Sequence, residues 1–271
     1  MFKMVVKELV QRIYQRGEIP ESFKSTTLMK LHKKGPKNVI DNYRWLHLKT
    51  WLPKITEKIV LLKLKDRMVA GTPEFQLGGQ PMGSCAEHLV KVNTLLEMRL
   101  AEKKPTVIHL YDIRKCFDQV NLWDVAWEAA EIGIVGQDLR FLIDINQDIK
   151  MKICGDSRPS AHFVARDTLG QGMVSACIGS SLTIARVVDR RFRWKTDKIC
   201  VADTAVDPSG FVDDILTMDG SASAGKDSCT RISDSLDELA LRAHPTKSVR
   251  IVVGRPADRE TVEEETGLKT K

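Results

Sequence analysis

Two adjacent aspartates, Asp213 and Asp214, lie inside an otherwise apolar run, Gly-Phe-Val-Asp-Asp-Ile-Leu. Successive side chains of a strand point to opposite faces of a sheet, so two neighbouring carboxylates can share one site only where the chain turns tightly. The run therefore predicts a β-hairpin over residues 209–217 with the two aspartates at its tip. Charged side chains are rare among such neighbours unless they are paired or bind a cation.

A third carboxylate, Asp112, follows the apolar, β-branched run Thr106–Tyr111, which predicts a buried strand. If this strand lies beside the hairpin, three carboxylates meet at one place. Oxygen ligands of this kind suit Mg²⁺, and two such ions can stabilise both oxygens of an in-line phosphoryl displacement. The alternative is that Asp112 caps a helix and that the aspartate pair forms an ordinary turn.

The rest of the chain alternates between helical and strand-like patterns. Apolar residues at helical spacing predict helices over 3–16, 53–69, 85–102, 172–194 and 227–243, and two helices within 122–148 that break near Gly133 and Gly136. Short strands are expected at 27–31 and 43–48, which form a hairpin, and at 149–154, 161–166 and 247–253. The order predicts an α+β fold with a small, mostly antiparallel sheet that helices cover on one side.

Composition and charge are those of a folded protein with a slight basic excess. Of the 271 residues, 42% are hydrophobic and 29% are charged, and the formal net charge is +6. This length is sufficient for one large domain or two joined lobes. Basic residues cluster in three segments, 30–37, 54–67 and 186–198. The clusters suit a polyanionic partner, and solvated helix faces are the alternative interpretation.

The cysteines and the N-terminus indicate the compartment. The 6 cysteines form no CxxC pair and no zinc-like spacing with histidine, so we expect reduced, buried thiols. The N-terminal segment lacks the apolar block of a signal peptide, and no apolar run approaches a membrane span. The sequence therefore predicts a soluble, intracellular protein with no membrane partner.

Four short motifs follow one another along the chain: Tyr111–Asp118, Leu169–Ser175, Phe211–Asp214 and Pro245–Ser248. In this order the sequence resembles reverse transcriptases, especially those of non-LTR retrotransposons and group II introns, over about residues 20–253. The resemblance implies a polymerase fold with fingers and palm. It also implies a nucleotidyltransferase, an RNA-directed DNA polymerase that adds dNTPs to a primer on an RNA or DNA template.

The resemblance assigns the catalytic groups. It makes Asp112, Asp213 and Asp214 the ligands of two Mg²⁺ ions, with Mn²⁺ able to substitute. It makes Lys247 the general acid that protonates the pyrophosphate leaving group. The alternative for Lys247 is a surface lysine at the start of a strand.

The resemblance also assigns nucleotide-binding residues. Lys33 and Arg44 would hold the incoming triphosphate, and Gln171 and Gly172 would lie beside the nucleotide at the start of a long helix. Phe117 would screen the 2′ position of the sugar, which disfavours an RNA-dependent RNA polymerase; plain core packing is the alternative. The stretch Phe75–Gly79 resembles the segment that lines the template–primer path.

The expected organisation is an N-terminal helix (1–20), a fingers-like region (21–104), a palm (105–253) and a polar tail (254–271), with no thumb. Two functions follow from it. The first is a reverse transcriptase core, active alone or together with further domains of a longer polyprotein. The second is a non-catalytic or truncated module of retroelement origin that binds nucleic acid through its basic patches, with salt-sensitive affinity.

Overall fold

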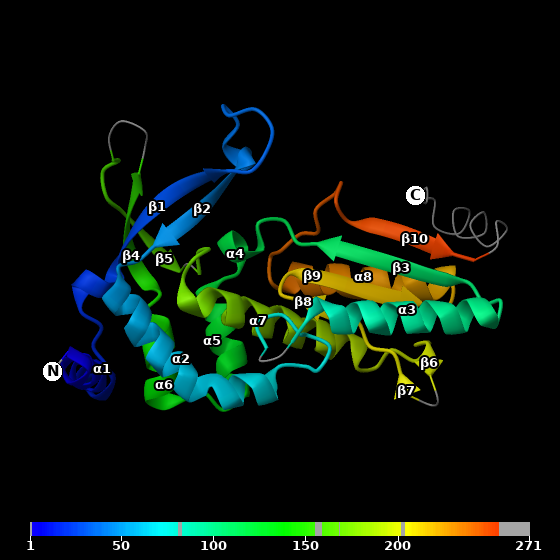
Figure 1. Cartoon of the computed structure of the whole chain (residues 1–271), viewed down its shortest axis with the longest axis horizontal. Helices are drawn as coiled ribbons and strands as arrows, with labels where there is room; N and C mark the ends of the chain where they lie inside the picture. Colours follow the sequence, from blue (N-terminus) through cyan, green and yellow to red (C-terminus); the bar gives the residue numbers. More distant parts are fainter. Residues whose placement is uncertain (1, 81–82, 155–158, 168, 202–203, 255–271) are drawn as a thin grey trace. The chain divides into compact units, whose positions relative to one another are not determined.

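A computed structural model describes residues 2–80, 83–154, 159–167, 169–201 and 204–254 (Figure 1). The chain divides into two compact units, which we call unit 1 (residues 1–71 and 117–182) and unit 2 (residues 72–116 and 183–271). Each unit combines two separate segments of the chain, whereas the predicted fingers and palm are each continuous. The fingers–palm division itself stays a prediction, and the predicted polar tail lies almost entirely outside the described residues.

Unit 1 is built on a mixed sheet with the strand order β2-β1-β4-β5. Its strands are β1 (Ser25–His32), β2 (Tyr43–Leu48), β4 (Gln147–Cys154) and β5 (Phe163–Asp167). Strands β1 and β2 form the predicted hairpin, with Thr27 paired to Leu48. The parallel pairing of β1 with β4 was not predicted, because it joins segments more than a hundred residues apart.

The helices of unit 1 are α1 (Phe2–Arg16), α2 (Trp51–Gly71), α5 (Leu122–Glu131) and α6 (Gly136–Asp144), with short 3₁₀ turns at Glu21–Lys24 and Ile40–Asn42. The predicted helical stretch to residue 148 was too long, because β4 begins at Gln147. In that strand Ile149 and Met151 are buried while Asp148 and Lys150 are exposed, which is a strand period rather than a helical one. The buried Asp138 of α6 joins α2 and α1, because it pairs with Lys63 at 3.1 Å and accepts from the Tyr14 hydroxyl.

Unit 2 is built on an antiparallel sheet with the strand order β10-β3-β9-β8. Its strands are β3 (Thr106–Asp112), β8 (Ser209–Phe211), β9 (Asp214–Asp219) and β10 (Val249–Val253), and its complete helices are α3 (Cys85–Ala101) and α8 (Ala222–Glu238). Helix α8 begins five residues earlier than predicted, because the Ser221 hydroxyl accepts from the Ala224 amide and caps it. A small pairing of β6 (Cys200–Val201) with β7 (Thr204–Ala205) was not predicted.

Both faces of the unit 2 sheet carry a helix, so the prediction of helices on one side was wrong. On one face Val107 packs with Ala222 of α8. On the other face Ile108 and Met218 pack against Leu95 of α3 (Figure 1). Along this second face the cover ends toward Leu110, which is 39% exposed. On this face, β3 is therefore open to solvent at Leu110.

Two further helices lie at the boundaries between the units along the chain. Helix α7 (Val174–Phe192) contains the boundary at residues 182 and 183, and α4 (Cys116–Gln119) contains the one at residues 116 and 117. Helix α7 confirms the long helix predicted after the glycine-rich motif, whereas α4 was not predicted.

All six cysteines are free thiols, as predicted, but only Cys116 is buried. Cys85, Cys154 and Cys200 are exposed, so the expectation of buried thiols was wrong for these three. None of the described helices is both long and apolar enough to cross a lipid bilayer.

Candidate active site

The predicted aspartate hairpin is formed by β8 and β9. Phe211 pairs with Asp214, which leaves Val212 and Asp213 as a two-residue loop. Val212 has φ +60°, in the left-handed region that a β-branched residue rarely adopts. Asp213 therefore lies in the turn itself, and Asp214 is the first residue of β9 rather than part of the tip.

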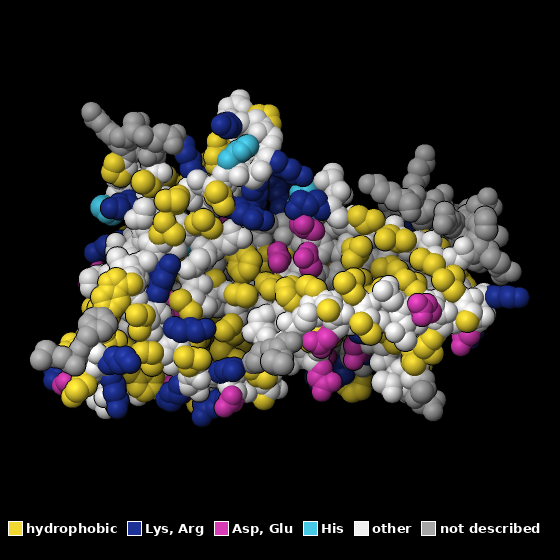
Figure 2. Space-filling model, in the orientation of Figure 1, with side chains coloured by type: hydrophobic (Ala, Val, Ile, Leu, Met, Phe, Trp, Pro, Cys, Tyr) yellow, Lys and Arg dark blue, Asp and Glu magenta, His cyan; other side chains and the backbone are white. Residues whose placement is uncertain are grey.

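Asp112 lies at the same end of the sheet as this hairpin. In the β3–β9 register Asp112 is directly opposite Asp214, and opposite residues of an antiparallel pair share a face. All three aspartates belong to unit 2. Asp213 and Asp112 are partly exposed and Asp214 is exposed. Figure 2 shows acidic side chains gathered at this open end of the strands.

The carboxylates repel one another. Burial raises the pKa of Asp213, and the charges of Asp214 and Asp112 raise it further. Asp214 is more exposed, yet partial desolvation of its carboxylate and the Asp112 charge likewise raise its pKa. The Lys247 ammonium acts in the opposite direction on the pKa of both groups. The site therefore has an excess of negative charge that a bound cation would relieve.

Lys247 supplies one positive charge directly, because its Nζ lies 2.7 Å from Asp112 Oδ2. The segment that carries it is fixed to the end of β3, since the His244 amide donates to the Asp112 carbonyl at 2.7 Å. Strand β10 then continues from this segment and pairs with β3, with Val249 opposite Leu110. The sequence motif Pro245–Ser248 thus places its lysine beside the first predicted metal ligand.

The donor set has the chemistry of a divalent-cation site, with hard oxygen ligands from three neighbouring carboxylates. Within the described residues, however, no three His, Cys, Asp or Glu side chains are grouped closely enough to hold a metal ion as they stand. The described arrangement pairs Asp112 with the Lys247 ammonium instead.

Gln76, in the stretch predicted to line the template–primer path, contacts the aspartate turn. Its side chain is 1% exposed and hydrogen-bonds to both the amide and the carbonyl of Val212. Nothing in the local sequence marks this role. A glutamine two residues before a pair of glycines is typical of a loop, and its partner lies 136 residues away.

The residues predicted to bind the nucleotide all belong to unit 1. Lys33 and Arg44 are exposed on the β1–β2 hairpin. Arg44 pairs with Leu31, and the Lys33 amide continues the ladder by donating to the Asn42 carbonyl at 2.8 Å. The strand period therefore directs the Lys33 and Arg44 side chains to one face of the hairpin.

The Gln171–Gly172 loop packs directly on β2. The His47 amide donates to the Gln171 carbonyl at 2.7 Å. A Cβ atom at Gly170 would lie 2.0 Å from the His47 imidazole, so only glycine fits there. Burial, reinforced by Lys49, lowers the pKa of His47 to about 4, so this ring is neutral at pH 7. Gly172 has φ +99°, a second requirement for glycine in this motif.

A buried ion pair holds the start of α7, and the sequence did not reveal it. Glu57 Oε1 accepts from the Ser175 amide at 2.7 Å, which caps the first turn of the helix. Its other oxygen lies 3.7 Å from Lys49 Nζ, and both side chains are almost fully buried. On α2 Glu57 fits the pattern of an ordinary charged helix position, so a search for helical periodicity treats it as solvated.

Phe117 is half-buried in α4 rather than on an extension of β3. The chain leaves the strand through Lys115, which has φ +50°, and enters the helix at Cys116. The chain therefore turns after Asp112 instead of continuing as a straight strand to Phe117.

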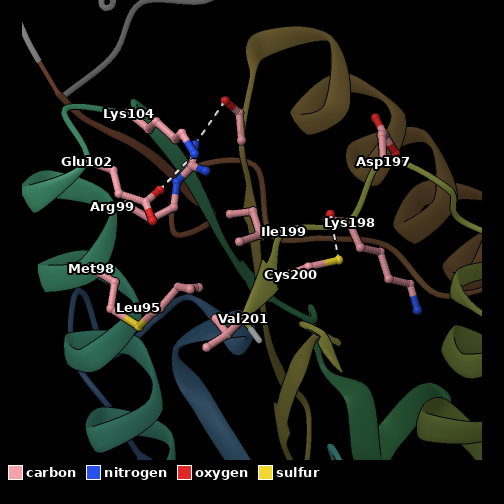
Figure 3. Close-up of a pocket in the computed structure, with 11 residues that line it drawn as sticks. Leu95, Met98, Arg99, Glu102, Lys104, Asp197, Lys198, Ile199, Cys200 and Val201 are labelled. Carbon is pink, nitrogen blue, oxygen red and sulfur yellow. Dashed lines mark hydrogen bonds and ion pairs between the residues drawn. The ribbon is translucent and has the colours of Figure 1, made fainter. Parts of the chain in front are cut away.

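A separate concavity of about 280 Å³ lies in unit 2 between the end of α3 and residues 197–201 (Figure 3). Its charged side chains already have partners. Lys104 pairs with Glu102 at 2.9 Å, Lys198 with Asp207 at 2.6 Å, and Arg99 donates to Thr106 Oγ1 at 3.0 Å. The cavity thus has none of the uncompensated charge found at the aspartate hairpin.

The fold is similar to that of solved telomerases. Apo telomerase from Candida tropicalis superposes with a TM-score of 0.65 at 12% identity, over 94% of this chain and 50% of that one. A form truncated from the C-terminal domain gives 0.63 at 12% identity, over 95% and 56%. Candida albicans telomerase with a fragment of telomeric RNA gives 0.56 at 12% identity, over 94% and 46%. The chain thus spans about half the length of these structures.

Sequence comparison gives the family. No curated protein matches the sequence at a significant level. A family profile described as reverse transcriptase (RNA-dependent DNA polymerase) matches residues 31–264, which include all four motifs and every predicted site residue. The chain belongs to the reverse transcriptase family, whose members are nucleotidyltransferases with an α+β fold.

Proposed function

We propose that this chain is the nucleotidyl-transfer core of an RNA-directed DNA polymerase that extends a primer with dNTPs. The observation that carries the proposal is the register of β3 and β9. It sets Asp112 opposite Asp214, with Asp213 in the adjoining turn and Lys247 2.7 Å from Asp112. Three carboxylates and one ammonium at the open end of one sheet are the groups that phosphoryl transfer requires.

Asp112, Asp213 and Asp214 would hold the divalent cations. The raised pKa values of Asp213 and Asp214, caused by burial and by repulsion from neighbouring carboxylates, support this assignment. When bound, Mg²⁺ or Mn²⁺ would neutralise negative charge on the phosphate oxygens. The carboxylates themselves orient these ions and cannot take over their role, since anionic side chains repel a triphosphate.

Lys247 is proposed to supply a proton to the pyrophosphate. Its ammonium is held at the site through Asp112, so it is positioned without substrate. A lysine that gives its proton to a leaving oxygen in the transition state contributes typically about 10²-fold to 10⁴-fold.

The unit 1 residues are proposed to bind the incoming nucleotide. Lys33 and Arg44, on one face of the hairpin, suit a triphosphate, since Arg offers a planar fork and Lys a point charge. Gln171 and Gly172 present backbone and amide groups at the start of α7, and Phe117 would exclude the 2′-hydroxyl. We also propose that residues 21–104 act as fingers and 105–253 as palm, on a primed RNA or DNA template.

A second candidate function is binding of nucleic acid without catalysis. It is favoured by the pairing of Asp112 with Lys247 and by the lack, in the described residues, of a ready-made group of three metal ligands. In this case the basic side chains of unit 1 would carry the function (Figure 2).

Primer extension decides between the two functions. The chain is incubated with Mg²⁺ or Mn²⁺, dNTPs and a primer annealed to RNA or DNA, and wild type is compared with Asp112→Ala. The polymerase proposal expects extension by wild type and a loss of about 10³-fold or more in the variant, since several kcal/mol of charge stabilisation disappear.

The matched control is Asp234→Ala, an exposed aspartate on α8 of the same unit, which should extend like wild type. Wild type that binds the primed template but incorporates nothing, under conditions where a related enzyme works, would contradict the polymerase proposal. Binding unaffected by Asp112→Ala would then support the second function.

A further inference from the structure

We propose that Gln76 is a positioning residue that clamps the turn carrying Asp213, and so sets the geometry of the predicted metal ligands. This rests on the proposed function of the aspartate site. The resemblance to the family assigned the segment around Gln76 to the template–primer path. In the structure its side chain faces the hairpin instead.

The amide of Gln76 makes three hydrogen bonds, two of them to one turn residue. Its Nε2 donates to the Val212 carbonyl at 3.0 Å, and its Oε1 accepts from the Val212 amide at 2.8 Å. The same oxygen accepts from the Gly78 amide at 2.9 Å. A primary amide that pairs with both backbone groups of one residue reproduces the pairing of a neighbouring strand. Val212 therefore has a strand-like partner although it lies outside the sheet.

The turn needs such a partner because its backbone is strained. Val212 has φ +60°, a region that a β-branched residue keeps only where its surroundings hold it there. Gln76 also provides a hydrogen-bond partner for both polar backbone groups of Val212. The clamp thus acts on the residue immediately before Asp213.

The backbone around Gln76 is fixed to the hairpin as well. The Leu77 amide donates to the Gly210 carbonyl at 2.9 Å, and the Gly210 amide donates to the Phe75 carbonyl at 2.8 Å. A Cβ atom at Gly78 would lie 2.1 Å from the Val212 amide nitrogen, so a larger residue would push the segment off the turn. These contacts hold the glutamine against the hairpin.

Because Gln76 is 1% exposed and all three of its polar contacts are within unit 2, its side chain is not available to a template. Its effect on catalysis would therefore pass through the placement of Asp213 and Asp214. Loss of that placement should slow the chemical step more than it weakens nucleotide binding.

Amide hydrogen exchange and primer extension with Gln76→Leu test this inference. Leu has a similar size but cannot bond to the turn. We expect exchange at the Val212 and Gly78 amides to accelerate at least about 10-fold, with exchange at Ile108 and Met218 unchanged. In extension assays we expect kcat to fall about 10-fold to 100-fold while the KM for dNTP stays within about 2-fold.

Two further variants make the exchange result specific. Gln76→Glu retains the acceptor for both amides and loses the donor to the Val212 carbonyl, so the two amides should be better protected than in Gln76→Leu but less than in wild type. Ser228→Ala removes buried hydrogen bonds of unit 2 away from the turn, so it should leave the Val212 and Gly78 amides protected. If Gln76→Leu does not fold, Gln76→Asn replaces it, since its shorter amide cannot reach the turn.

The outcomes separate this inference from the proposed function. Wild-type exchange rates in a folded Gln76→Leu or Gln76→Asn protein would overturn the clamp. Faster exchange with unchanged kcat in an active enzyme would overturn its positioning role and leave the polymerase proposal intact. A wild-type protein without extension activity would defeat the polymerase proposal, while the exchange rates would still report on the clamp.

Discussion

Asp213 is a residue whose surroundings disfavour its own charge. It is partly buried, follows the strained Val212, and lies near two other carboxylates. Natural active sites often hold such unfavourable groups, which lower stability until the ligand binds. The same feature that supports cation binding should therefore be measurable as a loss of folding stability.

We predict that Asp213→Asn abolishes extension and stabilises the fold. Asn has the same shape without the charge, so activity should fall about 10³-fold or more. Because the folded pKa of Asp213 is raised, the native state binds more protons than the unfolded state just above pH 3.8, and stability falls as pH rises through that window. The gain in Tm should thus be largest near pH 7 and shrink toward pH 3.5. A variant less stable than wild type at pH 7 would contradict this.

His109 should make the fold sensitive to acid. It lies under α8, and its Nε2 accepts from Arg250 Nε at 2.7 Å, with Lys195 and Asp219 also nearby. Burial, followed by the charges of Arg250 and Lys195, lowers its pKa from 6.5 to about 4. Between these values the unfolded state binds more protons, so stability is lost as pH falls from about 6.5 to about 4.

We predict that His109→Gln, which keeps an acceptor for Arg250, reduces this acid sensitivity. Denaturant titrations at pH 7 and pH 4.5 should show a smaller loss in the variant, by up to on the order of 3 kcal/mol. The exposed His162 provides the control, since His162→Gln should lose as much stability as wild type. Equal losses in all three proteins would rule out His109 as the source.

At the scale of helices and strands, the sequence correctly predicted the elements that depend on neighbouring residues alone. The β1–β2 hairpin, the strand before Asp112 and the aspartate hairpin follow from alternation and turn residues, and all three are present. The parallel β1–β4 pairing and the Gln76 contact depend on segments far apart in the chain. Local periodicity carries no information about these, because propensity and pattern describe only neighbouring residues.

We predict that Glu57 stabilises α7 through its buried contact with the Ser175 amide. Glu57→Ala removes this cap and leaves the Lys49 ammonium without its carboxylate, which should cost about 3–5 kcal/mol in the free energy of unfolding. Urea denaturation measures the cost.

The double variant Lys49→Met/Glu57→Gln tests the cause. It keeps the acceptor for Ser175 and removes both charges, so it should recover most of the stability. If the double variant is as unstable as Glu57→Ala, the lost stability comes from the ion pair itself and not from leaving the Lys49 charge unpaired.

At the scale of the whole molecule, the basic excess should govern nucleic-acid affinity. Lys58 and Lys65, seven residues apart on α2, are both exposed and lie on one side of the helix. Figure 2 shows exposed Lys and Arg side chains over the elements of unit 1.

We predict that Lys58→Gln/Lys65→Gln lowers the salt dependence of binding to primed RNA. Each lost phosphate contact should reduce the slope of log K against log salt by about 0.7–0.9, so by about 1.5 for both. Fluorescence anisotropy at several salt concentrations measures the slope. The charge-conserving pair Lys58→Arg/Lys65→Arg should retain it, and an unchanged slope in the Gln variant would exclude α2 from the interface.

The central strand of the unit 2 sheet has a consequence for biosynthesis. Strand β3 ends at Asp112, yet its two neighbours, β9 and β10, come more than a hundred residues later in the chain. During translation one edge of this apolar strand stays unpaired until β9 has left the ribosome at Asp219, and the other until β10 has left it at Val253. A stalled or prematurely terminated product would expose them as a template for aggregation, so recovery of the protein should depend on chaperones that shield nascent chains.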